Sequence, residues 1–250
     1  MIYSKLISRI IRFLKSLLSN SQISDHRFQN KNQVTNSDII LYLLKKKNFI
    51  PNFIVDVGCG YGEWTKKLLK IFPSSSYFLF DADKNNNNKL YNLKEKNKNI
   101  NYKICLLSND KKYYKFYNMG YGSSIFEEQT DYKRKIEEIL STRLKDELPK
   151  NLINFNNNLI KLDVQGSELK ILDGLEDLIE SFEVIIMEVS LHNYNKNSPL
   201  FDEVINYMRS KSFRLYDIFD PKRLGKDNSF LLQFDCMFVR NDSKLFNVKF

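Results

Sequence analysis

Short apolar runs and longer amphipathic segments alternate along the chain from residue 53 onward. Near-continuous apolar runs of about five residues are typical of parallel strands, because helices cover both faces of such a sheet. The predicted strands are residues 53–57, 77–81, 101–106, 158–163 and 183–188, and the predicted helices are residues 61–72, 87–97, a segment ending near 180 and residues 200–211. This order indicates an α/β fold with a doubly wound, mostly parallel sheet.

The chain ends on two further predicted strands, residues 213–219 and 234–239, with no helix-length segment between them. Strands that follow each other without a crossover helix pair antiparallel. We therefore expect a terminal antiparallel hairpin at the edge of the sheet.

Residues 107–158 interrupt the alternation. They contain a glycine-rich turn at 120–124 and a charged stretch near 131–147 that we expect to be helical. One interpretation of this insertion is a lid or substrate wall at the strand ends, and the other is a solvated excursion without a role in the site.

The first fifty residues form a separate segment, followed by one domain over residues 51–250. Residues 1–20 predict a basic amphipathic helix, residues 21–37 a polar linker and residues 38–48 a short helix. Two interpretations of the first helix stay open. It packs on its own domain or on a second subunit, which we favour, or it lies on an anionic membrane surface.

The positive charge is concentrated in that segment. The 250 residues carry a net charge of +9, of which the first fifty hold +7 and the remaining 200 hold +2. A protein that follows a phosphate backbone carries its excess charge around its cleft, so nucleic acid is not the expected partner. We expect a small-molecule or glycan acceptor instead, with a homo-oligomer as an open alternative.

Cysteines and hydropathy bear on the compartment. Three widely separated cysteines with no C-x-x-C pair favour reduced thiols, and no run reaches 18 apolar residues. We expect a cytoplasmic protein, with peripheral contact at the inner membrane surface through residues 1–20 as the alternative.

The apolar run at 53–57 ends in a loop with the pattern D-x-G-x-G-x-G, from Asp56 to Gly62. Glycines allow positive φ angles and let a ligand approach closely, and the following helix N-terminus adds a positive end. A dinucleotide loop requires G-x-G-x-x-G, but Glu63 occupies the position of the third glycine. Acids at both edges of the loop repel a pyrophosphate and attract an ammonium or sulfonium group. S-adenosylmethionine carries both groups, so we predict it as the cofactor.

A second acid, at the end of the next strand, is expected to bind the ribose hydroxyls of such a ligand, and Asp81 occupies that position. Ser108, just beyond the third strand, is a further candidate. The predicted cofactor-binding residues are Asp56, Gly58, Gly60, Gly62, Glu63, Asp81 and Ser108.

The chain resembles the FkbM-type family of S-adenosylmethionine-dependent methyltransferases. The resemblance rests on VDVGCGYGE at 55–63, LFDA at 79–82, GSSI at 122–125, IKLDVQGSE at 160–168, IIMEV at 185–189 and FDCMFVR at 234–240. It implies a Rossmann-like sheet of seven strands and O-methylation, often of sugars in glycans or secondary metabolites. Many relatives have E-P where this chain has Asp81-Ala82, and the first fifty residues lie outside the match.

Methyl transfer to a hydroxyl requires alignment of donor and acceptor and removal of a proton. His192 follows the carboxyl end of a predicted strand and is our first choice for the base. Asp163 and Glu188 end neighbouring strands and are expected to orient the acceptor. The same two carboxylates would also suit a divalent metal, but two ligands do not make a metal site, so we predict none.

The prediction is an O-methyltransferase that acts on a sugar hydroxyl of a glycan, sugar nucleotide or related metabolite. Two alternatives remain: a non-catalytic scaffold with this fold, docked to a membrane or a partner, and an RNA methyltransferase.

Overall fold

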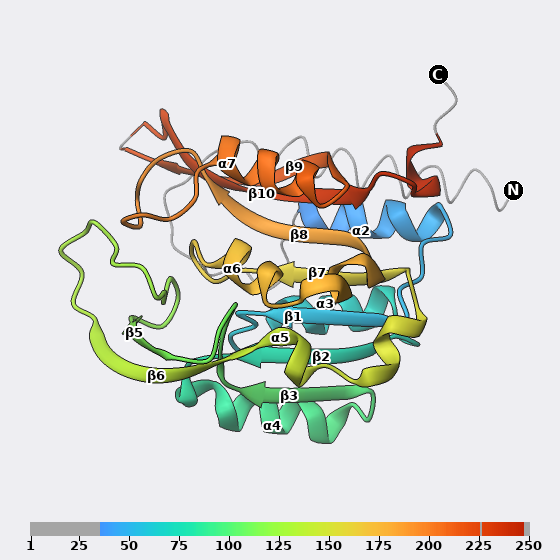
Figure 1. Ribbon diagram of the computed structural model, residues 1–250, viewed down its shortest axis with the longest axis horizontal. Helices are drawn as coiled ribbons and strands as arrows, with labels where there is room; N and C mark the ends of the chain where they lie inside the picture. The colour runs from blue at the N-terminus through green and yellow to red at the C-terminus, as the bar shows by residue number, and fades with distance from the viewer. Residues whose placement is uncertain (1–35, 226, 248–250) are drawn as a thin grey trace, which may run out of the picture. The chain divides into compact units, whose positions relative to one another are not determined.

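The computed structural model describes residues 36–225 and 227–247, and its centre is a seven-stranded sheet (Figure 1). The strands lie in the order β3-β2-β1-β7-β8-β10-β9. Their bounds are Ile100–Ile104 for β3, Ser76–Asp81 for β2, Phe53–Val57 for β1, Asn158–Leu162 for β7, Phe182–Ser190 for β8, Phe230–Arg240 for β10 and Phe213–Leu224 for β9. From β3 to β8 neighbouring strands are parallel, whereas β10 runs antiparallel to both β8 and β9. The predicted doubly wound sheet with its terminal hairpin is therefore confirmed.

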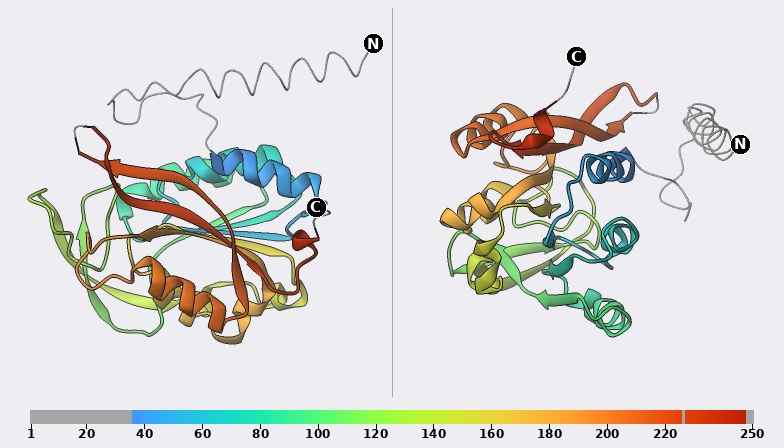
Figure 2. Two further views of the ribbon diagram at one scale, coloured as in Figure 1. Left: turned by 90° about the horizontal axis from the view of Figure 1, so that it is seen from above. Right: turned by 90° about the vertical axis from the view of Figure 1, so that its right-hand side faces the viewer.

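Helices cover both faces of this sheet (Figure 2). One face carries α2 (Asn36–Lys46), α3 (Glu63–Ile71) and α4 (Asn87–Lys96), and the other carries α6 (Glu168–Asp173) and α7 (Phe201–Ser210). Successive strand residues face opposite cores because the side chains of a strand alternate. In β1, Ile54 packs with the first set of helices and Val55 with the second.

The helix that the sequence predicts over 38–48 is α2, and it contributes to the core. Leu41 and Leu44 on its inner face are buried together with Phe49, which follows the helix. The helix predicted over residues 1–20 and the linker up to residue 35 lie outside the described residues.

A second, three-stranded sheet stands beside the first. It consists of β4 (Leu106–Ser108), β6 (Lys135–Arg143) and β5 (Tyr113–Asn118), with β6 in the middle. The prediction of a helix near 131–147 is wrong, since this stretch is largely β6, and only Leu144–Glu147 forms a helix, α5. The charged sequence of β6 suits a helix, but pairing with the aromatic strand β5 outweighs this local preference.

Two other predicted elements are divided. The strand expected at 101–106 ends at Ile104, and β4 follows it in the second sheet. The helix expected to end near 180 stops at Asp173 and is followed by the 3₁₀ helix η3 (Glu176–Ser181). Gly174 lies at this break, where a Cβ atom would come within 2.5 Å of the Ser108 carbonyl oxygen. The remaining short helices are η1 (Lys84–Asn86), η2 (Lys150–Asn154) and η4 (Lys244–Phe246).

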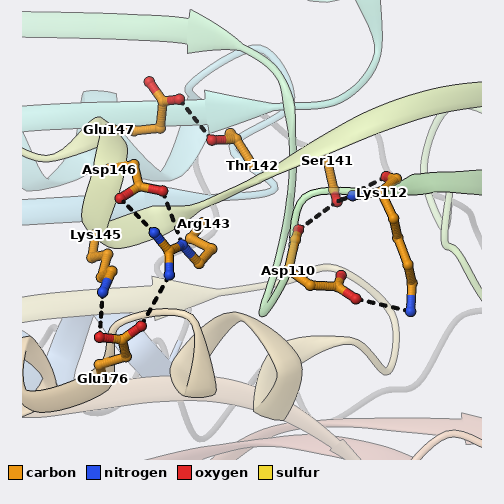
Figure 3. Close-up of polar contacts among 9 residues, drawn as sticks. All are labelled: Asp110, Lys112, Ser141, Thr142, Arg143, Lys145, Asp146, Glu147 and Glu176. Carbon is orange, nitrogen blue, oxygen red and sulfur yellow. Dashed lines mark hydrogen bonds and ion pairs between the residues drawn. The ribbon is translucent and has the colours of Figure 1, made fainter.

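Polar contacts fasten the second sheet to the body of the domain (Figure 3). At the end of β6 and the start of α5, Arg143 and Lys145 both form ion pairs with Glu176 of η3. Within the second sheet, near the same end of β6, the Ser141 hydroxyl donates to the Asp110 carbonyl over 2.7 Å. The two ion pairs therefore hold the end of β6 and the start of α5 beside η3.

Candidate functional site

A cavity opens at the carboxyl ends of β1, β2 and β7. Its lining comes from the glycine loop after β1, the turn after β2, the end of β7 with its following turn, and the insertion between β3 and β7. The insertion supplies Phe116 and residues 120–125. Ligands bind at this edge of open α/β sheets, so the position agrees with a ligand site.

Two buried polar atoms in the lining have no hydrogen-bond partner among the described residues. They are the Asp56 Oδ1 atom and the Trp64 Nε1 atom. The other Asp56 oxygen accepts a hydrogen bond of 2.6 Å from the Thr65 hydroxyl. Buried polar groups are rarely left unpaired, so the cavity offers one acceptor and one donor to a ligand.

Burial raises the pKa of Asp56 to about 6, although the Lys161 charge and the Thr65 hydrogen bond oppose this shift. Nearby Asp163 and Asp81 add to the increase. A cation bound beside Asp56 would favour its ionised form and relieve this penalty.

The glycine loop is held by β2. The Gly58 and Cys59 amides donate to the Phe80 carbonyl, and the Gly60 amide donates to Asp81 Oδ2 over 2.8 Å. Both Gly58 and Gly60 have positive φ angles, +74° and +54°. A Cβ atom at Gly58 would lie 1.9 Å from the Asp163 carbonyl oxygen, whereas one at Gly60 would meet nothing within 4 Å. Only Gly60 therefore leaves open space; at Gly58 the close neighbour is the protein's own backbone.

Asp81 lines the cavity at the end of β2. Its Oδ1 atom accepts hydrogen bonds from the Asp83 amide and the Asn86 side chain, over 2.8 and 3.0 Å. Burial raises the pKa of Asp81, and these hydrogen bonds oppose the shift. A carboxylate has about four acceptor positions, so one remains for a ligand hydroxyl.

Lys161 on β7 and Asp163, which directly follows this strand, form an ion pair of 2.7 Å between Nζ and Oδ2. Burial opposes the ionisation of Asp163, but the charges of Lys161 and Lys222 outweigh it and hold its pKa at about 2. Burial likewise opposes the charge of Lys161, while the surrounding carboxylates, Asp163 first, raise its pKa above the usual value. Asp163 is thus an ionised carboxylate in the wall of the cavity at neutral pH.

The turn after β7 is fixed from inside. Glu168 is buried, and its carboxylate accepts hydrogen bonds from the Val164 and Gly166 amides. The Gln165 side chain donates to Asp163 and to Glu188, and the second Glu188 oxygen pairs with Lys222. Glu188 therefore holds Gln165, which lines the cavity.

Several residues predicted from the sequence do not line the cavity. The His192 ring is exposed and stacks on Phe230 with 4.2 Å between ring centres. Ser108 is buried, and its hydroxyl bonds to Tyr114. Glu188 lies behind Gln165, and a Cβ at Gly62 would meet Leu93. The structure brings together Asp56, Gly58, Gly60, Glu63, Asp81 and Asp163.

Other lining residues were not predicted. Tyr61 lies within the glycine loop, Trp64 follows the loop, Lys161 lies two residues before Asp163, and Tyr121 belongs to the insertion. The single tryptophan of the chain, directly after the glycine loop, was the one sequence feature that could have been noticed.

Among the described residues no group of three or more His, Cys, Asp or Glu side chains is arranged to hold a metal ion. In the same part of the chain no helix is long and apolar enough to cross a membrane.

A family model described as the methyltransferase FkbM domain matches residues 53–215. A comparison with curated proteins finds no match. Similar solved structures include a precorrin-6y C5,15-methyltransferase from Geobacter metallireducens, with 10% identity, 85% of this chain and 93% of that chain covered, and a TM-score of 0.46. TrmK of M. capricolum, in complex with S-adenosylhomocysteine, is 12% identical; the match covers 84% of this chain and 70% of TrmK, with a TM-score of 0.48. A SAM-dependent methyltransferase from Aquifex aeolicus is 14% identical; the match covers 82% of this chain and 89% of that chain, with a TM-score of 0.42.

Proposed function

The chain belongs to the FkbM family of S-adenosylmethionine-dependent methyltransferases, and we propose that it transfers the methyl group to a sugar hydroxyl of a glycan, sugar nucleotide or related metabolite. The observation that carries this proposal is the convergence of three strand-end carboxylates on one cavity. Asp56 is the next-to-last residue of β1, Asp81 is the last residue of β2 and Asp163 directly follows β7. All three line the cavity beside the glycine loop.

The unpaired atoms of the cavity fit the amino-acid part of the donor. Asp56 Oδ1 is an acceptor for its ammonium group, and Trp64 Nε1 is a donor for its carboxylate. Lys161, whose Nζ lies 5.7 Å from the centre of the Trp64 ring, adds a positive charge beside that carboxylate. Gly60, in the same lining, leaves open space where a side chain would stand.

Asp81 is our candidate for binding the ribose hydroxyls, through the one acceptor position that its other hydrogen bonds leave. Its hydrogen bonds to the Gly60 amide and Asn86 fix the direction of the carboxylate before a ligand arrives. Preorganisation of this kind lowers the cost of binding.

S-adenosylmethionine supplies an electrophilic methyl group on a positively charged sulfur. Asp163 accepts a hydrogen bond from the acceptor hydroxyl, orients its oxygen and takes its proton as the new C–O bond forms and the C–S bond breaks. A carboxylate with a pKa of about 2 is a strong enough base to take this proton. The proton on the hydroxyl oxygen becomes strongly acidic once the oxygen is alkylated. Gln165 and Glu188 position Asp163 from the other side.

The lining of the cavity also supports a sugar as the acceptor. Asp163 and Gln165 offer polar groups to ring hydroxyls, and Tyr61 and Tyr121 add two aromatic rings to the lining, although the Lys89 Nζ atom lies over one face of the Tyr61 ring. Polar groups combined with aromatic rings suit a polyhydroxylated ring better than a purely apolar substrate.

Incubation of the full chain with labelled S-adenosylmethionine and a panel of sugar nucleotides, glycans and glycolipids tests the proposal. We expect label in a base-stable ether on one sugar class. Label in RNA, or in an amine, would contradict it. Donor binding without transfer to any acceptor of the panel would favour the alternative of a non-catalytic scaffold with this fold.

A further inference from the structure

The tip of the insertion carries one aromatic residue between two glycines, Gly120-Tyr121-Gly122. Both glycines have positive φ angles, +77° and +89°, and a Cβ at Gly120 would meet nothing within 4 Å. The Gly120 amide donates to the Asn118 side chain over 3.1 Å, and 76% of Tyr121 is exposed.

The base of the same turn is fixed. Tyr117 and Ser124 exchange two backbone hydrogen bonds, and the Ser124 hydroxyl donates to the Gln165 carbonyl over 2.8 Å. Ser123 closes the turn internally by donating to the Gly120 carbonyl. These hydrogen bonds fix the place at which the turn presents Tyr121.

The turn lies across the donor cavity from the glycine loop. Residues 120–125 line the cavity on one side and the glycine loop lines it on the other, and both segments lie where the central strands end (Figure 1). The Tyr121 ring meets the Tyr61 ring edge to face, with 5.9 Å between centres and 76° between planes. Tyr61 lies between Gly60 and Gly62, so the contact joins the insertion to the donor-binding loop.

We propose that Tyr121 closes over the bound donor by its contact with Tyr61 and so sets the rate at which donor and product leave the cavity. The inference rests on the proposed function, because the gate acts on the ligand of that same cavity. An edge-to-face pair is ordinarily worth a small free energy, so the gate slows dissociation without sealing the site.

The tryptophan of this chain makes the gate measurable without turnover. Trp64 is the single tryptophan of the sequence and lines the cavity. We expect its fluorescence to change when S-adenosylhomocysteine binds to the full chain, and stopped-flow mixing then measures association and dissociation separately.

For Tyr121→Ala we expect the dissociation rate constant to rise about two- to tenfold, the range that loss of one aromatic pair produces. The association rate constant should stay within about twofold of wild type, and Tyr121→Phe, which keeps the ring, should dissociate like wild type. The matched control is Tyr113→Ala, since this tyrosine is 68% exposed on β5 and does not line the cavity.

Combination with Tyr61→Ala tests the contact itself. We expect the double variant to dissociate no faster than the faster single variant, because either substitution removes the same contact. A Tyr121→Ala variant that binds and releases the ligand at the wild-type rates would overturn the gate and leave the proposed function intact. A wild-type chain that binds no ligand would overturn both.

Discussion

At the scale of single residues, the charge of Asp56 decides how strongly the cavity attracts a cation. Its pKa of about 6, raised by burial, means that the carboxyl is ionised above pH 6 and neutral below it. The neutral form cannot pair with an ammonium group, so donor affinity should fall as the pH is lowered from 7 to 5. Calorimetric titration with S-adenosylhomocysteine at several pH values measures this fall.

The variant Asp56→Asn is the control for this assignment. It keeps an acceptor for the Thr65 hydroxyl but loses the charge. We expect weaker binding at pH 7 and little change between pH 7 and pH 5. A variant with the wild-type pH profile would assign the titration to another group, of which Glu168 and Asp235, each with a pKa raised by burial to about 7, are the nearest in value.

The proton-accepting residue is tested by two substitutions in parallel. Asp163→Asn should lower turnover by about 10²–10⁴-fold, because it removes the group that takes the proton. His192→Ala should stay within a few-fold of wild type, since the imidazole stacks on Phe230 outside the cavity. Single-turnover assays with saturating donor measure both; the opposite ranking would return the role to His192.

At the scale of elements, two glycines of one loop should respond to alanine in opposite ways. Gly58→Ala forces a Cβ against the Asp163 carbonyl and should lower the free energy of unfolding by about 2–4 kcal/mol. The methyl group of Gly60→Ala meets no protein atom, so only the left-handed backbone conformation lowers the free energy of unfolding, by about 1–2 kcal/mol. The same methyl group enters open space in the donor cavity. Urea denaturation and donor titration of both variants separate the effects. Equal stability of the two variants would contradict this description of the loop.

The second sheet shows where local patterns mislead. The β6 sequence, from Lys135 to Arg143, reads as a charged helix because its Lys and Glu residues favour one. Its strand conformation depends on β5, some twenty residues earlier, which supplies three tyrosines and a phenylalanine as cross-strand neighbours. A pattern read within one segment does not contain that partner.

At the scale of the whole molecule, the central sheet was predictable because its middle strands β1 and β7 are buried on both faces and the intervening helices are amphipathic. The positions of Asp56, Asp81 and Asp163 followed from their places at strand ends. The contributions of Trp64, Lys161 and Tyr121 did not, because each depends on how separate segments meet in space. His192 was chosen as the one histidine at a strand end, and its stacking on Phe230, nearly forty residues later, is not visible in the sequence.

The central claim is that this cavity binds S-adenosylmethionine through its strand-end carboxylates. Calorimetric titration of the full chain and of Asp81→Ala, side by side, tests it most directly. We predict one donor per chain for wild type and an affinity about 10- to 100-fold lower for the variant, the loss expected for hydrogen bonds to a charged group. Melting curves would show that the variant is folded. Absence of binding by wild type, or equal affinity of the two proteins, would contradict the claim.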